Sequence, residues 1–344
     1  MLKVITQKTE WNKAIDGFDK KDFYHSYDYH QACLKEKEAA KLLFYESGET
    51  TIAFPLLIRP INGSGYFDAA SVYGYAGPLV SGFGPDFNFE DWKKQLLTFF
   101  SENRIVSVFS STNPFIDHQI ELLSTFGDIE NLGNIVYFDL ESPQAHLKQY
   151  SKTTKRYVKR NKGLFKIREG KSEEDALLFL KIYYRSMDRL HADSQYYFKL
   201  PYFLDLLKSE SCDAYFVFAV SNDSGKEISA AFIIRTNHII QYHLSGTLDD
   251  YRHLSPIRTI IDHTRKKGIT DNYSFFNLGG GVGSKNDSLY DFKASFSKTR
   301  IPFQVWKFIA DDEVYHQLCK EYPPIQDLDK PNYFPKYRSS LNNS

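Results

Sequence analysis

Residues 276–284 read FNLGGGVGS, and residues 285–297 continue as KNDSLYDFKASFS. A β-type apolar run ends here in four glycines within five positions, and we call residues 279–284 the glycine loop. Glycines at a strand end let backbone N–H groups approach a ligand, because no Cβ stands in the way. Residues 288–296 predict one or two turns of helix with a single lysine, Lys293, which can meet a phosphate or a developing oxyanion. We therefore expect the chemistry of this chain at the glycine loop.

The glycine pattern excludes two common nucleotide sites. Ser284 occupies the last position of a would-be GxGxxG, so the loop does not fit a dinucleotide-binding fingerprint. The spacing GxxxxGK[ST] of a P-loop is absent as well. A tight strand-to-helix turn is the plainer interpretation, although four glycines exceed what such a turn requires.

Composition describes a globular protein without a general affinity for nucleic acid. The 344 residues are enough for two domains with separate cores, and 42% are hydrophobic against 25% charged. The 43 basic and 43 acidic residues cancel, which argues against a DNA-binding protein. Within residues 148–171, however, Glu169 is the only acid among many cations. This basic run predicts either contact with an RNA backbone or a diphosphate, or a solvated helix followed by a linker.

Cysteine usage and hydropathy place the protein in the cytoplasm. Cys33, Cys212 and Cys319 are far apart and form no CxxC pair, so neither a disulfide scaffold nor a zinc site is expected. No signal peptide is evident, and no apolar run reaches the roughly 18 residues of a membrane span. We expect no metal and no transmembrane segment.

Three blocks of sequence carry a family resemblance. The pattern LGGGVGS followed by DSLYxFKxxFS resembles the signature of the FemA/FemB/FemX transferases, which are GNAT-like. Residues 241–247, 250–256 and 267–268 fit the segment that precedes this signature in the family. Residues 71–78, SVYGYAGP, resemble the YGYxGP element near its N-terminus.

The resemblance implies an α/β protein made of tandem GNAT-like domains, each with a mixed central sheet flanked by helices. Two halves of the sequence do share one order of expected elements. We expect a first, acceptor-side domain from residues 1–141 plus 311–344. Residues 142–310 would form the second, donor-side domain with the glycine loop.

The same resemblance implies an enzyme, an acyltransferase or aminoacyltransferase that forms an amide on an amine of a cell-envelope precursor. In the family, the lysine of the FKxxF element polarises the donor carbonyl, and Lys293 matches it; a surface lysine on a short helix is the alternative. Leu289, Phe292 and Phe296 are spaced to face a core, which places Lys293 at its rim. Asp287, His243, water or the substrate remain open as the base.

Further residues are candidates for binding the substrate or the donor. His243 and Tyr242 share a strand, where a packed histidine is the alternative to a base. Arg252 and Arg258 bracket the start of a helix, whose N-terminus suits an anion. Arg189 suits bidentate binding of a phosphate. Tyr73 and Tyr75 of the YGYAGP turn would line an acceptor cleft between the domains or fill the first core. The candidates are Gly279, Gly280, Gly281, Gly283 and Ser284 of the loop, with Tyr242, Arg189, Arg252, Arg258, Tyr73 and Tyr75.

One departure from the family affects the substrate. FemX-like members carry Ser-x-x-Trp and a lysine four residues later in the first helix, whereas this chain has Ser26, Tyr29 and Cys33. The donor therefore stays open between aminoacyl-tRNA and acyl-CoA, with no bound cofactor. The acceptor is expected to be a peptidoglycan peptide or a nucleotide-linked amino-sugar precursor of a polysaccharide. Charged tRNA and a membrane surface are open as partners, and a non-catalytic precursor-binding module is the alternative class.

Overall fold

The computed structural model describes residues 1–142, 146–324 and 333–341. The chain forms two compact units, Met1–Leu132 with Phe303–Ser344 (unit 1) and Gly133–Pro302 (unit 2). It passes between them within two strands, β7 (Asp128–Asp139) and β13 (Arg300–Ile309). The domain boundaries expected from the sequence, at 141/142 and 310/311, lie beyond the C-terminal ends of these strands. Residues 325–332 and 342–344 of the expected tail lie outside the described residues.

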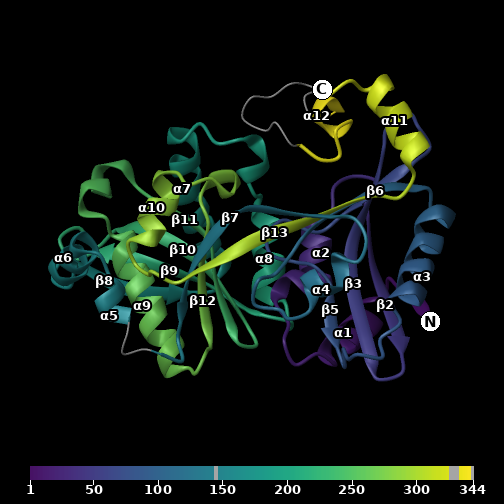
Figure 1. The fold of residues 1–344 in the computed structure, drawn as a ribbon. Helices are drawn as coiled ribbons and strands as arrows, with labels where there is room; N and C mark the ends of the chain where they lie inside the picture. Colours follow the sequence, from purple (N-terminus) through teal and green to yellow (C-terminus); the bar gives the residue numbers. More distant parts are fainter. Residues whose placement is uncertain (143–145, 325–332, 342–344) are drawn as a thin grey trace. The chain divides into compact units, whose positions relative to one another are not determined.

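Unit 1 is a mixed sheet with helices around it (Figure 1). Its strands follow the order β1-β2-β3-β4-β6-β13, with β5 paired to β3; all pairs are antiparallel except β4 with β6. The other elements of unit 1 are β1 (Leu2–Ile5), α1 (Lys8–Asp16), α2 (Tyr27–Cys33), β2 (Ala39–Ser47), β3 (Thr50–Pro60), β4 (Phe67–Ala70), β5 (Leu79–Ser81), α3 (Phe89–Glu102), β6 (Ile105–Ser111), α4 (Gln119–Leu123), α11 (Asp312–Glu321) and α12 (Arg338–Leu341).

The core of unit 1 is aromatic. Trp92 and Phe100 of α3 pack on Tyr45 and Phe54 of the β2–β3 hairpin, and Trp306 of β13 joins them. All five side chains are fully buried. Burial of large rings supplies a large share of the hydrophobic stabilisation, which explains the aromatic richness of the sequence.

Two histidines in unit 1 are buried in their neutral form. His25 and His30 are both 0% exposed, and burial lowers the pKa of His25 to about 4 and that of His30 to about 3. The fold thus favours neutral imidazole, whereas the unfolded chain binds protons below about pH 6.5. Protonation of the unfolded state then removes stability as the pH falls.

We therefore expect the free energy of unfolding to fall between pH 6.5 and 5 by about 1 kcal/mol per pH unit for each of these histidines. Urea titrations at several pH values measure it. His30→Gln should flatten the slope, and His316→Gln, at an exposed position, should not. An unfolding free energy that stays constant over this range would contradict the assignment.

Unit 2 repeats the α/β layering (Figure 1). Its strands follow the order β7-β12-β11-β10-β9-β8, and β11 with β12 is the parallel pair. The other elements of unit 2 are α5 (His146–Gln149), α6 (Lys152–Asn161), β8 (Phe165–Gly170), α7 (Glu173–Arg189), α8 (Leu200–Lys208), β9 (Asp213–Ser221), β10 (Glu227–Thr236), β11 (Ile239–Thr247), the short 3-10 helix η4 (Asp249–Leu254), α9 (Ile257–Thr270), β12 (Phe275–Gly279) and α10 (Ser288–Ala294).

Helices cover both faces of the unit 2 sheet. Phe232 of β10 meets Phe179 of α7, whereas its neighbours Ala231 and Ile233 share a cluster with Ile260 of α9. Since successive strand residues point to opposite faces, α7 and α9 lie on opposite sides. The predicted mixed sheets flanked by helices are therefore present in both units.

Gly268 lies inside a helix, since α9 continues past it to Thr270. A Cβ on Gly268 would lie 2.6 Å from Ile240 and 2.8 Å from Leu140, so this glycine allows the helix to pack closely on the sheet. Across the described residues, no helix combines the length and the apolar character that crossing a membrane demands.

Candidate active site

The glycine loop begins with a backbone kink that buried amides hold in place. Gly279 ends β12 with a φ of 78°, in the region that favours glycine. Its N–H donates to the Asn277 side-chain oxygen at 2.8 Å, and the Asn277 amide donates to Gln241 at 2.8 Å. Asn277 and Gln241 are 1% and 2% exposed. This amide pair fixes the direction in which the loop leaves the sheet.

Asp287 closes the loop from its other end. One carboxylate oxygen accepts the N–H of Val282 at 2.9 Å, and the other accepts the N–H of Tyr290 at 2.8 Å, which caps α10. Both oxygens are thus engaged by backbone donors. Asp287, which the sequence offered as a candidate base, therefore ties the glycine loop to the first turn of α10, and we call this arrangement the clamp.

Gly281 is required by this clamp. A Cβ there would come within 2.1 Å of the Lys285 carbonyl oxygen and 2.3 Å of the Asp287 carboxylate. We expect Gly281→Ala to open the loop and to lower the transfer activity that the family resemblance implies at least about tenfold, since small misplacements at a reacting centre are costly. Steady-state rates measure the effect. Gly163→Ala, where nothing lies within 4 Å, is the control, and equal rates for the two variants would contradict this role.

Lys293 is buried beside the loop. Its side chain reaches back from α10, and Nζ donates to the Gly280 carbonyl oxygen at 2.7 Å. The residue is 9% exposed, and this burial lowers the pKa of the ammonium to about 8, against a smaller opposing effect of Asp287. Lys293 is therefore a protonated, poorly solvated cation at neutral pH.

The expected apolar stripe of α10 is only partly buried. Phe296 is 0% exposed and Phe292 is half-buried, but Leu289 is 39% exposed. The prediction that Leu289 faces the core is wrong, and Lys293 lies deeper than the rim. Only seven residues are helical, so the stripe reaches the core at its C-terminal end alone.

Two backbone donors of the loop remain available. Within the part of the chain that the structure describes, the N–H groups of Gly280 and Gly281 donate to no acceptor. Lys293 uses one of its three N–H bonds on Gly280. Lys293 and these N–H groups can each donate to a negatively charged oxygen. The Gly281 N–H points away from Lys293, because it lies opposite the Gly280 carbonyl in the same trans peptide.

Tyr242 and His243 have partners of their own on β11. The Tyr242 hydroxyl donates to Ser245 Oγ at 2.6 Å, and burial raises its pKa. His243 Nε2 lies 2.6 Å from the Tyr202 hydroxyl, and burial lowers its pKa to about 3. His243 occupies an irregularity in the β10–β11 register, next to the ring of Phe232. A neutral imidazole of this pKa is a weak base.

The three candidate arginines differ in environment. Arg189 donates to the Thr247 carbonyl at 3.3 Å and pairs with Asp249 at 2.5 Å. Arg252 is exposed on η4. Arg258, at the start of α9, is 9% exposed, and this burial lowers its pKa. Arg258 donates to the hydroxyl groups of Thr154, Ser255 and Ser295.

Tyr73 and Tyr75 belong to a braced turn in unit 1. The Tyr29 hydroxyl donates to the Tyr73 carbonyl at 2.8 Å, and the Asn113 amide donates to the Tyr75 carbonyl at 2.9 Å. The Gln119 amide donates to the carbonyls of Ala76 and Pro78 at 3.1 and 2.9 Å. Tyr73 itself is 54% exposed. The turn is thus rigid and presents an open aromatic side chain.

The sequence analysis missed the bracing residues Asn113 and Gln119. They follow β6 and lie about 40 positions from the turn in sequence, so no local pattern reveals the contact. Gly74 of the turn did carry a signal. Its φ is 114°, and a Cβ there would lie 2.1 Å from the Tyr24 ring, so only glycine fits.

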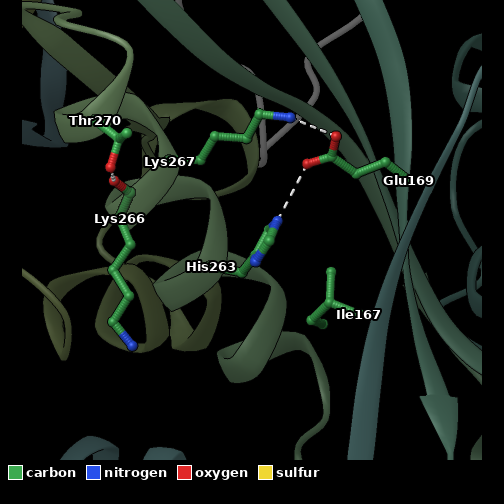
Figure 2. Close-up of a pocket in the computed structure, with 6 residues that line it drawn as sticks. All are labelled: Ile167, Glu169, His263, Lys266, Lys267 and Thr270. Atoms are coloured by element: carbon green, nitrogen blue, oxygen red, sulfur yellow. Dashed lines mark hydrogen bonds and ion pairs between the residues drawn. The ribbon is translucent and has the colours of Figure 1, made fainter.

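A shallow depression on unit 2 lies outside this region. It is formed by β8 and α9, has a volume of about 520 Å³, and is lined by Ile167, Glu169, His263, Lys266, Lys267 and Thr270. Figure 2 shows Glu169 between Lys267 and His263, which leaves its carboxylate neutralised. Among the described residues, no cluster of histidine, cysteine or carboxylate side chains could hold a metal ion.

Comparison with known proteins bears on the segment just described. The model of the FemAB family matches residues 218–301, which include the glycine loop and Lys293. No curated protein matches the chain.

Solved structures share the fold at low identity. FemX has a TM-score of 0.69 at 9% identity, covering 92% of this chain and 99% of that chain. L-PGS from Bacillus licheniformis has a TM-score of 0.58 at 13% identity, covering 89% and 92%. A tandem GNAT protein from the clavulanic acid biosynthesis pathway has a TM-score of 0.50 at 8% identity, covering 90% and 99%. The predicted resemblance and fold class are confirmed: this chain is similar to the FemAB family over residues 218–301, and it shares its fold with FemX and with the tandem GNAT protein.

Proposed function

We propose that this protein is a transferase that moves an aminoacyl or acyl group from an activated ester or thioester onto an amine of a cell-envelope precursor. The observation that carries the proposal is Lys293, a buried cation that forms no ion pair with a carboxylate among the described residues and whose Nζ lies 2.7 Å from the Gly280 carbonyl oxygen of the glycine loop. Burial of an ammonium group is unfavourable, and groups with perturbed pKa values concentrate at functional sites.

The reaction follows from these donors. The neutral amine of the acceptor attacks the donor carbonyl carbon, forming a C–N bond and a tetrahedral oxyanion. Lys293 stabilises that oxyanion with its remaining N–H bonds. The intermediate collapses with release of the RNA hydroxyl or the CoA thiol as the leaving group, which takes up the proton that the amine loses. No covalent enzyme intermediate is needed.

The surroundings of the candidate bases favour the substrate or water as the proton acceptor. Both oxygens of Asp287 accept backbone N–H groups, and His243 has a pKa of about 3 beside Tyr202. We assign Asp287 to positioning the loop and His243 to packing. We assign the donor to unit 2, and the acceptor to unit 1 at the turn that presents Tyr73.

The donor class separates two versions of this proposal. Similarity to the FemAB family supports an aminoacyl-tRNA donor, and the tandem GNAT neighbour supports an acyl-CoA. A precursor-binding module without catalysis is the alternative from another class. The acceptor is a peptidoglycan peptide or a nucleotide-linked amino sugar in either version.

Thermal shifts at low salt test the proposal. The panel holds acyl-CoAs, free CoA, UDP- and dTDP-amino sugars, UDP-muramyl pentapeptide and charged tRNA. Binding to the folded state raises the melting temperature by mass action. A shift with a donor and an acceptor supports a transferase, a shift with acceptors alone supports a binding module, and no shift with any compound would overturn the proposal.

A further inference from the structure

Arg258 joins three helices of unit 2 at one point. It is the second residue of α9, and its guanidinium donates to the hydroxyl of Thr154 in the first turn of α6. The same nitrogen donates at 2.8 Å to the hydroxyl of Ser295, which is the C-cap of α10. The hydroxyl oxygens of Thr154 and Ser295 also lie 2.9 Å apart. The C-terminal end of α10 is thus attached to the N-terminal ends of α6 and α9.

Aromatic side chains at the same end of α10 pack on this guanidinium. Its central carbon lies 4.7 Å from the centre of the Phe292 ring and 5.2 Å from that of Phe296. The two rings meet edge to face, with their centres 5.2 Å apart. Phe296 is fully buried while Leu289 is exposed, so α10 meets the core chiefly at this end. Arg258 therefore supports the part of α10 that is packed.

Lys293 lies between the two attachments of α10. Asp287 caps the N-terminal end of the helix, and Ser295 attaches the C-terminal end. A helix of seven residues has few internal hydrogen bonds and is marginal by itself, so its position depends on such attachments. Lys293 is only two positions before Ser295. Displacement of this end would move Nζ away from the Gly280 carbonyl oxygen, to which it donates at 2.7 Å.

The environment of Arg258 is a poor one for a residue that serves stability alone. It is 9% exposed and, among the described residues, forms no ion pair with a carboxylate. Burial of a guanidinium without a counter-ion is unfavourable, and an apolar side chain of similar volume would fill the same space at lower cost. A guanidinium does supply a planar fork of fixed direction, which neither an apolar side chain nor lysine reproduces. Arg258 thus favours one geometry of α10 at some cost in stability.

We propose that Arg258 is a positioning residue for Lys293, because it holds the C-terminal end of α10 and thereby keeps the lysine buried at the glycine loop. The inference rests on the proposed function in one respect, which is that Lys293 acts on the donor carbonyl. In the transferase, Arg258→Met is expected to lower kcat at least about tenfold with little change in KM, since a displaced lysine affects the reacting centre and not the binding of the substrates.

Competitive labelling with acetic anhydride, followed by mass spectrometry of the peptide that contains Lys293, tests the inference without any substrate. Only the neutral amine reacts, so the midpoint of the labelling rate against pH reports the pKa of the lysine, and the maximal rate reports its access to solvent. In the wild type we expect the midpoint at about pH 8, where burial places the pKa of Lys293. In Arg258→Met the midpoint should move up by about one pH unit or more, and the maximal rate should rise several-fold, because water reaches the amine.

Three further variants separate geometry from charge and from folding. Arg258→Lys keeps the positive charge but cannot bridge Thr154 and Ser295 with a fixed fork, so its midpoint should also rise. Ser295→Ala removes one acceptor and leaves the charge in place, and it should shift the midpoint in the same direction by a smaller amount. Arg235→Met is the matched control, since Arg235 is a partly buried arginine of the same unit whose carboxylate partners lie on β9 and directly after α9. Its midpoint should equal that of the wild type.

Several results would overturn the inference. They are equal midpoints for the wild type, Arg258→Met and Arg235→Met, full restoration of the wild-type midpoint by Arg258→Lys, or a rise in KM without a fall in kcat for Arg258→Met. The second result would assign to Arg258 an effect of charge alone, and the third would assign it to substrate binding. Labelling requires no transfer, so its outcome is separate from that of the proposed function, which fails when the wild type transfers no acyl group from any donor.

Discussion

Lys293→Met is expected to lower the transfer rate about 10²- to 10³-fold and to leave the fold at least as stable as the wild type. The rate falls because the main cationic donor to the oxyanion is lost. Stability is retained because the folded pKa of Lys293, about 8, lies below the 10.5 of the unfolded chain. At pH 7 both states carry the ammonium group, and burying it costs about 3 kcal/mol relative to the neutral amine. The substitution by methionine removes this burial cost, which stabilises the fold, but it also removes the hydrogen bond to the Gly280 carbonyl.

Single-turnover rates and urea denaturation at pH 7 measure the two effects. Lys298→Met, at an exposed position nearby, is the control and should change neither. In the wild type, the rate should also fall about tenfold per pH unit above about pH 8 as Lys293 loses its proton. A Lys293→Met protein that unfolds more easily but still transfers would show that this lysine serves only to hold the loop.

Asp68→Asn is expected to lower the free energy of unfolding of unit 1 by about 3–5 kcal/mol. Asp68 is 0% exposed, and its two oxygens accept from Arg59 and from Arg338, both at 2.7 Å. The Tyr337 hydroxyl also donates to it at 3.1 Å. Loss of the carboxylate charge leaves two guanidinium groups with little compensation and releases α12 from β4.

Urea denaturation monitored by tryptophan fluorescence measures this loss. Glu46→Gln breaks the exposed pair with Lys3 and is the control, expected to stay within about 0.5 kcal/mol of the wild type. A destabilisation by Asp68→Asn as small as that of the control would show that the buried ion pairs do not anchor the C-terminal segment.

The local features of the site were predictable from the sequence. The strand into the glycine loop, the short helix after it and Lys293 follow from glycine content and apolar spacing, which act over a few residues. The structure has these elements as β12 and α10, with Asp287 as the N-cap. Family resemblance added the tandem fold.

The long-range contacts were not predictable. Arg258 meets Thr154, which lies 104 positions earlier, and Asn277 meets Gln241 across two strands. Burial of Lys293 and exposure of Leu289 depend on how far α10 reaches over the sheet. Such contacts arise from the packing of whole elements, which a single sequence does not encode in any local pattern.

The most direct test of the central claim is a transfer assay with purified protein. Charged tRNA or an acyl-CoA is supplied together with a panel of muramyl-peptide and nucleotide amino-sugar acceptors, and mass spectrometry follows amide products. We predict that one acceptor gains the acyl group in the presence of the wild type and that Lys293→Met forms at least about a hundredfold less product. Equal product from both proteins would contradict the catalytic role of Lys293, and no product from any pair of substrates would contradict the transferase itself.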